Sequence, residues 1–187
     1  MTGGQRSSDV VVPAGAVGRV QEGYAELCCR TNYSFLEGAS HPDELVRRAA
    51  GLGHRALAVT DVNSLAGVVR AHVAACELGE DQEWSLVCGA RLRLQDAPPV
   101  VVWVPDREGY AALCRLLTLG RRRAPKGECY LWWRDVVELG GSLLGGVLLH
   151  RMLPSGLMLR DSQDEVMAFL GQFAETFGDR GYALGGL

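Results

Sequence analysis

The sequence lacks the motifs of the common nucleotide-binding and zinc-binding folds. No GxGxxG follows its first candidate strand and no GxxxxGK[ST] occurs, so a Rossmann or P-loop site has no support. Six cysteines are present, but none form a CxxC pair or a Cys/His cluster with zinc-ligand spacing. We therefore expect these cysteines to be reduced and buried, packed as small hydrophobic side chains.

Membrane segments, an export signal and a basic surplus are also missing. No apolar run approaches the length of a membrane span, and Met1–Val20 lacks the charge order of an export signal. The formal net charge is −3, whereas a protein that binds nucleic acid by itself is more often basic. The sequence thus predicts a cytoplasmic protein that does not bind a membrane and contacts DNA only indirectly.

What is present is an alternation of apolar strands and amphipathic helices after a leader. Residues 1–22 are rich in Gly and Ser and predict a flexible leader, and residues 23–187 are long enough for one domain with a sizeable core. The alternation predicts an α/β fold with a largely parallel sheet, either a barrel or an open doubly wound sheet. Strands are expected near residues 24–28, 56–60, 84–94, 99–104, 143–150 and 181–186, and helices near 41–52, 64–78, 106–119 and 161–177.

In such a fold the loops after the strands carry the chemistry, and here they read CRTNYSFLEGAS, TDVNS and CGAR. Asp61 is the natural ligand for a hard metal ion at these strand ends. Arg30 and Arg91 cannot be ligands, because a guanidinium group stays protonated and offers no lone pair. We expect Asp61 to bond backbone amides or to form an ion pair with an arginine, which would balance the charges without a metal.

Several strings together resemble one known family. YAELCCRTNYSFLEGASHPDELVRRAAGLG, ALAVTDVNSLAGVVRAHVAA and GYAALCRLLTLGRRRAPKGECYLWWRDV resemble the PHP (polymerase and histidinol phosphatase) domain of bacterial error-prone C-family DNA polymerases, the second alpha-type subunit of damage-induced mutagenesis. The resemblance runs from about residue 24 to 185. It implies a PHP-type distorted β/α barrel, similar to a TIM barrel. Family barrels use about seven strands, so we expect this domain to be truncated before its last strands.

The resemblance also locates the family's metal ligands. In metal-binding PHP domains the first strand ends in His-x-His, the second in Thr-Asp-His and the third in Gly-x-Glu. On this chain those positions are Cys28 and Arg30, then Asp61 and Val62, then Arg91. Only Asp61 matches. The resemblance therefore implies no catalytic residue and no metal cofactor, and a non-catalytic scaffold within an error-prone polymerase active in translesion synthesis.

Two other functions stay open. The chain could be a free-standing metal-dependent PHP phosphoesterase that holds zinc or manganese with Cys28, Asp61 and His150. It could also be a stand-alone protein-interaction module derived from the polymerase. Under the scaffold hypothesis, its partners are the remainder of a C-family polymerase or accessory mutagenesis proteins.

Some residues outside the motif have two interpretations each. The basic run is either a solvated surface or a contact with DNA or the polymerase body; it comprises Arg121, Arg122, Arg123 and Lys126. His41 is expected to cap or flank the first helix, and His72 to be a half-buried structural side chain. Strand alternation would bury one of Trp132 and Trp133 and leave the other as a candidate docking surface.

Overall fold

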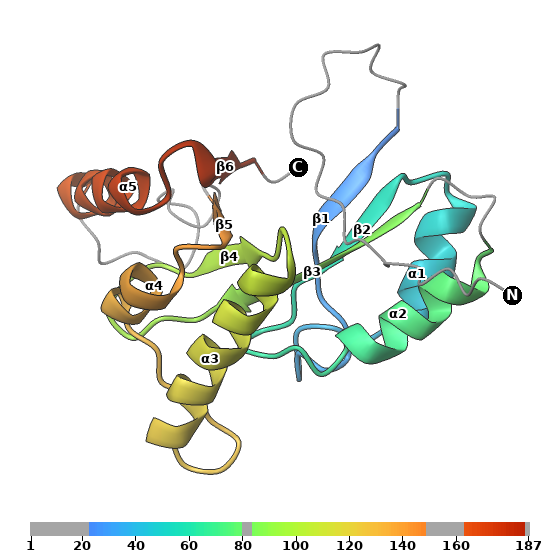
Figure 1. The fold of residues 1–187 in the computed structure, drawn as a ribbon, viewed down its shortest axis with the longest axis horizontal. Helices are drawn as coiled ribbons and strands as arrows, with labels where there is room; N and C mark the ends of the chain where they lie inside the picture. The colour runs from blue at the N-terminus through green and yellow to red at the C-terminus, as the bar shows by residue number, and fades with distance from the viewer. Residues whose placement is uncertain (1–22, 80–83, 149–162, 186–187) are drawn as a thin grey trace, which may run out of the picture.

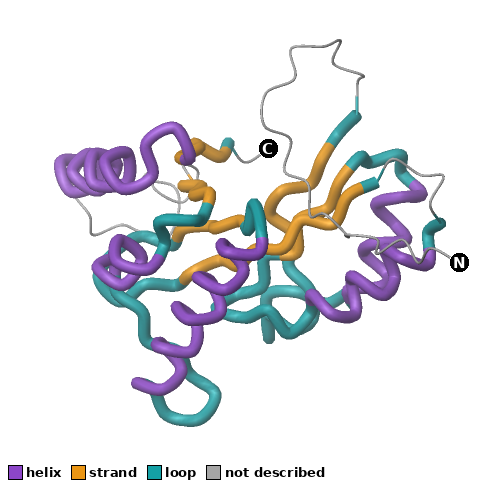
Figure 2. Tube along the Cα trace, in the orientation of Figure 1, coloured by secondary structure: helices purple, strands orange, loops and turns teal. Residues whose placement is uncertain are grey.

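The computed structural model describes residues 23–79, 84–148 and 163–185. The predicted leader of residues 1–22 and His150 lie outside the described residues. Figure 2 shows the strands in the centre of the molecule and the helices around them. No helix in the described part of the chain has the length and apolar character that a membrane span requires.

Within the described residues, six strands form one sheet whose order follows the sequence, β1-β2-β3-β4-β5-β6. The sheet curls into a half-barrel (Figure 1), which confirms the predicted α/β class and the incomplete barrel. The strands are β1 (Ala25–Cys29), β2 (Ala56–Val59), β3 (Ser85–Leu92), β4 (Val100–Trp103), β5 (Leu144–Leu148) and β6 (Gly181–Leu184).

The sheet is mixed, so the prediction of a largely parallel sheet is wrong in its middle. Pairs β1–β2, β2–β3 and β5–β6 are parallel, but β3–β4 and β4–β5 are antiparallel. The chain between β3 and β4, residues 93–99, is too short for the crossover that a parallel pair needs. The parallel strands β1, β2 and β3 therefore form the part of the sheet whose ends can gather one site.

The helices are α1 (Pro42–Gly51), α2 (Val68–Glu77), α3 (Arg107–Arg123), α4 (Trp133–Leu139) and α5 (Gln163–Phe177), followed by the short 3₁₀ helix η2 (Gly178–Arg180). His41 occupies the N-cap of α1, as predicted, and its backbone N–H donates to Glu44 at 2.8 Å. Helix α3 begins after Asp106, whose carboxylate accepts from the Gly109 N–H at 2.8 Å. It also runs past its predicted end at residue 119.

Strand alternation divides the core between the two faces of the sheet. Leu57 and Val59 of β2 pack with the helices in the larger cluster, while Ala58 between them belongs to a smaller cluster on the inner face. On that inner face, the indole N–H of Trp103 on β4 donates to the Leu27 carbonyl of β1 at 2.8 Å. This bond joins strands that are not neighbours and so holds the curl of the half-barrel.

The apolar pattern of residues 64–78 predicts a buried face that includes Val69, Val73 and Cys76, but helix α2 buries a different set of side chains. Val68, Ala71 and Ala74 are buried, whereas Val69 and Val73 are 69% and 54% exposed. Small alanine side chains allow α2 to lie close to its neighbours, and a pattern based on the largest apolar side chains misses this. His72 follows the exposed face, so its predicted half-buried position is wrong.

The Trp132–Trp133 pair begins a helix, α4, that the sequence pattern did not predict. Trp133 is buried against Phe169, with ring centroids 5.0 Å apart, whereas Trp132 is the N-cap residue. One tryptophan is therefore core, as expected, but a helix start and not strand alternation separates the two. Arg123 lies over the Trp132 ring at 5.4 Å from its centroid.

Candidate functional site

The ends of the three parallel strands meet through backbone hydrogen bonds. The Thr60 N–H donates to the Cys29 carbonyl at 2.7 Å, and the Arg91 N–H donates to the Asp61 carbonyl at 3.1 Å. Val62 forms an isolated parallel bridge with Arg91. The positions predicted from separate motifs therefore lie in one place, at the carboxyl ends of β1, β2 and β3.

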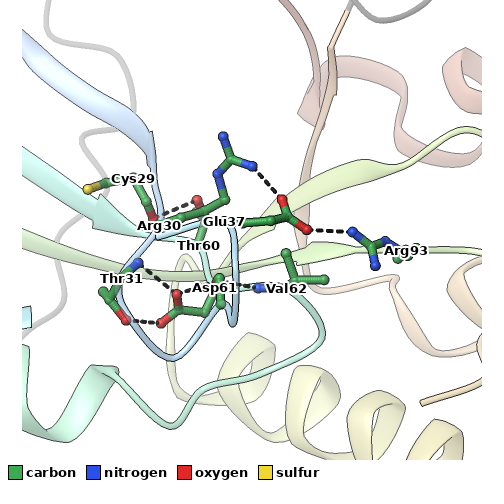
Figure 3. A network of polar contacts seen from close by, with 9 residues as sticks. Cys29, Arg30, Thr31, Glu37, Thr60, Asp61, Val62 and Arg93 are labelled. Carbon is green, nitrogen blue, oxygen red and sulfur yellow. Dashed lines mark hydrogen bonds and ion pairs between the residues drawn. The ribbon is translucent and has the colours of Figure 1, made fainter. Parts of the chain in front are cut away.

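Asp61 is fully buried and bonds the loop that follows β1. Its Oδ1 accepts from the Thr31 backbone N–H at 2.8 Å and from the Ser34 hydroxyl at 2.6 Å, and its Oδ2 accepts from the Thr31 hydroxyl at 2.8 Å. Figure 3 shows the two bonds with Thr31. The expected hydrogen bond from a backbone amide is confirmed, and two hydroxyl groups donate further hydrogen bonds to the same carboxylate. The carboxylate thus fastens the β1 loop to the end of β2.

The space beside Asp61 is closed by backbone as well as by side chains. A Cβ atom on Gly67 would lie 2.7 Å from Asp61 Oδ2, and one on Gly38 would lie 2.1 Å from the Thr31 carbonyl oxygen. Both glycines therefore permit a close approach that a larger residue would prevent. Asp61 is enclosed on the side of the β1 loop and on the side of α2.

Glu37, in the same loop, is shared by two arginines. Its Oε2 accepts from Arg30 at 2.5 Å and its Oε1 accepts from Arg93, just after β3, at 2.5 Å (Figure 3). Partial burial opposes ionisation of Glu37, but the Arg30 hydrogen bond and the charges of Arg93, Arg30 and Arg91 hold its pKa below the usual value. Arg30 therefore pairs with Glu37, not with Asp61.

Asn63 links the loop after β2 to both β3 and α3. It has a positive φ of 46°, and its side-chain oxygen accepts from the Arg93 backbone N–H at 2.9 Å. Its carbonyl accepts from the Arg121 guanidinium at 2.8 Å. Arg121, a residue of the predicted basic run, therefore forms a structural hydrogen bond in the site.

The other residues of that run are either bonded within the protein or exposed to solvent. Arg123 donates to the buried Asp135 of α4 at 2.7 Å, whereas Arg122 and Lys126 are exposed. The solvated-surface interpretation fits these last two. Two of the four cations are thus occupied within the protein, and the run is not one continuous basic patch.

The two adjacent cysteines of β1 lie on opposite faces of the sheet. Cys28 packs against the inner cluster and Cys29 against the larger one. Burial raises the pKa of Cys28, although a hydrogen bond with Thr60 and the charges of Arg91 and Arg30 act in the other direction. Burial, aided by Glu26 and Asp61, raises the pKa of Cys29 to about 11. Both are therefore protonated thiols near neutral pH, and a protonated thiol is a poor metal ligand.

All six cysteines are free, as expected, but the prediction that they are buried holds only in part. Cys88 is buried, while Cys76 is exposed on α2. Cys76 lies on the exposed side of that helix, as Val73 does, so the prediction of burial fails at both residues for the same reason.

The side chains at the ends of β1, β2 and β3 do not fit a divalent metal ion. Within the described ranges no group of three or more His, Cys, Asp or Glu side chains is placed to hold one. Both oxygens of Asp61 already accept hydrogen bonds, and Arg30 and the nearly buried Arg91 bring positive charge to the same strand ends. The side chains that do the bonding, Thr31, Ser34, Glu37, Asn63 and Arg93, were not predicted from the sequence.

Polar residues at the ends of parallel strands in a curled half-barrel are the arrangement of a PHP domain. The chain belongs to the PHP domain family, which matches residues 26–185. Among its relatives, the error-prone DNA polymerase of Rhodopirellula baltica is 45% identical over 162 residues, a match that covers 86% of this chain and 14% of the polymerase. That of Bordetella parapertussis is 54% identical over 124 residues, or 64% of this chain and 11% of the polymerase.

The match is to the N-terminal region of these polymerases. The chain spans only 14% and 11% of the lengths of the two relatives. Two solved structures share the fold at 15% identity and a TM-score of 0.59. A protein from Bifidobacterium adolescentis described as a metal-dependent phosphoesterase is covered over 76% of its chain. An amidohydrolase from Chromobacterium violaceum, with bound sulfate and no metal, is covered over 75%.

Proposed function

We propose that this chain is the PHP region of an error-prone DNA polymerase of damage-induced mutagenesis and translesion synthesis, and that the region itself is a non-catalytic scaffold. The observation that supports it most is the state of Asp61. It is the one ligand position that matches the metal-binding family pattern, and its carboxylate is committed to Thr31 and Ser34. This occurs in a chain 45% identical to a curated error-prone polymerase.

A scaffold needs a rigid frame, and the strand ends supply one. Asp61 ties the β1 loop to β2, Glu37 ties it to Arg93 after β3, and Arg121 ties α3 to Asn63. Nucleotidyl transfer would belong to a part of the polymerase outside this chain. The proposal assigns the protein to DNA repair and replication in the cytoplasm and requires no metal cofactor. Its partners are the remainder of a C-family polymerase or accessory mutagenesis proteins.

A second candidate is the free-standing phosphoesterase, and the phosphoesterase among the solved structures of this fold favours it. It would hold zinc or manganese through Cys28, Asp61 and His150. Two properties of the described residues oppose it: the Cys28 thiol has a raised pKa, and the Asp61 oxygens are engaged. A metal at this place would have to displace the bonds that hold the β1 loop.

Metal analysis separates these candidates. The purified chain is analysed by mass spectrometry for zinc and manganese and assayed with bis(p-nitrophenyl) phosphate in the presence of each metal. We expect metal far below one ion per chain and hydrolysis no faster than in buffer. Stoichiometric metal, lost together with hydrolysis in Asp61→Ala but kept in the control Asp43→Ala, would overturn the scaffold proposal.

The mass of the cellular product tests the polymerase part of the proposal. An immunoblot against this domain should detect a protein several-fold larger than the 20.2 kDa of this chain. A product near 20 kDa would instead support the stand-alone interaction module and reject membership in a polymerase.

A further inference from the structure

The exposed face of α2 carries a histidine and a cysteine one helical turn apart. His72 and Cys76 are four positions apart in this helix, so their side chains lie on the same face. Both residues are exposed, and the Nε2 atom of His72 is 3.7 Å from the Cys76 sulfur. The other five cysteines are buried or half-buried. Cys76 is therefore the thiol most open to a ligand from outside the chain.

The separation of these two atoms, 3.7 Å, matches one edge of a tetrahedral zinc site. Zinc lies about 2.3 Å from a cysteine sulfur and about 2.0 Å from a histidine nitrogen, so at the tetrahedral angle the two ligand atoms are about 3.6 Å apart. The same separation suits a weak hydrogen bond between the thiol and the imidazole, which the pair forms without metal. The two atoms are thus already spaced to bind one zinc ion.

A single chain supplies only half of the ligands that such a site needs. Structural zinc sites are four-coordinate and closed, and in the described part of the chain no third His, Cys, Asp or Glu side chain joins this pair. A two-fold axis through the ion would bring the same pair from a second copy and complete a Cys₂His₂ set. Each thiol releases a proton to solvent on binding, so two thiolates balance the two positive charges of the ion.

We propose that two copies of this chain bind one zinc ion between them through His72 and Cys76 of each copy. Helix α2 lies at the periphery of the molecule, at the opposite end from α4 and α5 (Figure 1), where a second copy can approach it. Val69 and Val73 are 69% and 54% exposed on the same helix. Closing two copies on the ion would remove these valines from water, which favours association.

The charged residues of α2 do not oppose this contact. Arg70 pairs with Asp43 of α1 at 3.0 Å, and Glu77 pairs with Arg47 of α1 at 3.0 Å. Two arginines therefore face two acids, and the row beside the histidine and cysteine has no surplus charge that would repel a second copy.

The apolar contact alone is too small to hold two copies together. Stable interfaces bury about 800 Å² on each partner, whereas α2 is a helix of ten residues. The bonds to the metal must supply the rest, so we expect association only with zinc. At low protein concentration each chain offers two ligands, too few to retain the ion, and the isolated chain stays largely free of metal.

The proposal is tested on the 187-residue chain, with a phosphine reductant present to keep Cys76 from forming a disulfide. Sedimentation velocity measures the fraction of dimer as zinc chloride is added, and mass spectrometry measures the zinc content of the dimer after gel filtration. We expect a dimer that forms with zinc, dissociates with EDTA and contains one zinc ion for each pair of chains.

Variants of the two ligands give the decisive comparison. Cys76→Ser and His72→Ala should each weaken the zinc-induced dimer about tenfold or more, since even changes outside the ligands of a metal site cost about that much. Cys76→His keeps a ligand at this position and should retain the dimer. The matched control Cys114→Ser removes a half-exposed thiol from α3 and should leave the dimer unchanged.

Four results would overturn the proposal: a monomer at every zinc concentration, a dimer that forms equally without zinc, one zinc ion per chain without association, or equal losses in Cys76→Ser and Cys114→Ser. Cobalt(II) in place of zinc should give the visible absorption of a tetrahedral thiolate site, and Cys76→Ser should abolish it. Circular dichroism verifies that each variant retains its fold. The outcome is independent of the polymerase proposal, because a metal at the strand ends would be lost in Asp61→Ala and kept in Cys76→Ser.

Discussion

Replacing Asp61 by alanine should destabilise the protein strongly, because its carboxylate accepts three hydrogen bonds from the β1 loop. The substitution leaves three buried donors without their acceptor: the Thr31 N–H, the Thr31 hydroxyl and the Ser34 hydroxyl. Thr31 is fully buried and Ser34 is 3% exposed, so water cannot easily replace the carboxylate. At about 1 kcal/mol or more for each orphaned donor, Asp61→Ala should lower the free energy of unfolding by about 3 kcal/mol.

Asp61→Asn separates the loss of charge from the loss of hydrogen bonds. The asparagine oxygen can accept from the Thr31 N–H and the Ser34 hydroxyl, and its amide can donate to the Thr31 hydroxyl if that group turns. Volume and bond number are then kept, while the bonds lose their charge assistance. We expect a cost of about 1 kcal/mol, roughly a third of that of the alanine variant.

The assay is urea unfolding followed by tryptophan fluorescence, with and without EDTA. A loss of about 3 kcal/mol corresponds to a fall of about 1 M or more in the urea midpoint of Asp61→Ala, at a typical slope for a domain of this size. EDTA should not change the wild-type midpoint, and Asp43→Ala should remain close to it. If Asp61→Ala has the wild-type midpoint, or if EDTA lowers the wild-type midpoint to that of the variant, the reasoning is refuted.

Two further predictions concern the same loop and strand. Leu36 is 89% exposed with a positive φ of 63°, so Leu36→Gly should raise the thermal midpoint by relieving up to about 1 kcal/mol of backbone strain. Phe35→Gly, equally exposed, should lower it, and the reverse order would contradict the strain. Because the pKa of Cys29 is raised from 9.0 to about 11, the stability it contributes is complete below pH 9 and is lost between pH 9 and 11. Urea midpoints of Cys29→Ala should fall less over this range than those of the wild type, and parallel curves would contradict the shift.

The strands and the strand-end positions could be predicted because their signals are local. Apolar runs such as ALAV of β2 mark buried strands, and the carboxyl ends of the strands fix where Asp61, Val62 and Arg91 lie. Whether neighbouring strands are parallel or antiparallel was harder to predict, because it depends on the length of the connection between them. The short connection from β3 to β4 contained that information, and the apolar pattern did not.

The bonding within the site could not be read from the sequence, because its partners are far apart along the chain. Asp61 and Thr31 are separated by a helix and a strand, and Glu37 and Arg93 by even more. An arginine partner for Asp61 was a reasonable expectation on charge alone. Backbone geometry instead offers hydroxyls and an amide at 2.6 to 2.8 Å, and Arg30 pairs with Glu37.

These bonds account for the presence of a carboxylate at Asp61, among the positions that the resemblance matches to metal ligands. Cys28 contributes mainly packing on the inner face, and Val62 contributes a backbone N–H that donates to Ser34 at 3.0 Å. Neither role demands a metal-binding side chain. Asp61 alone serves as acceptor for three buried donors, so it is needed whether or not a metal is present. Structural demand therefore suffices to account for Asp61, and its presence is not evidence for catalysis.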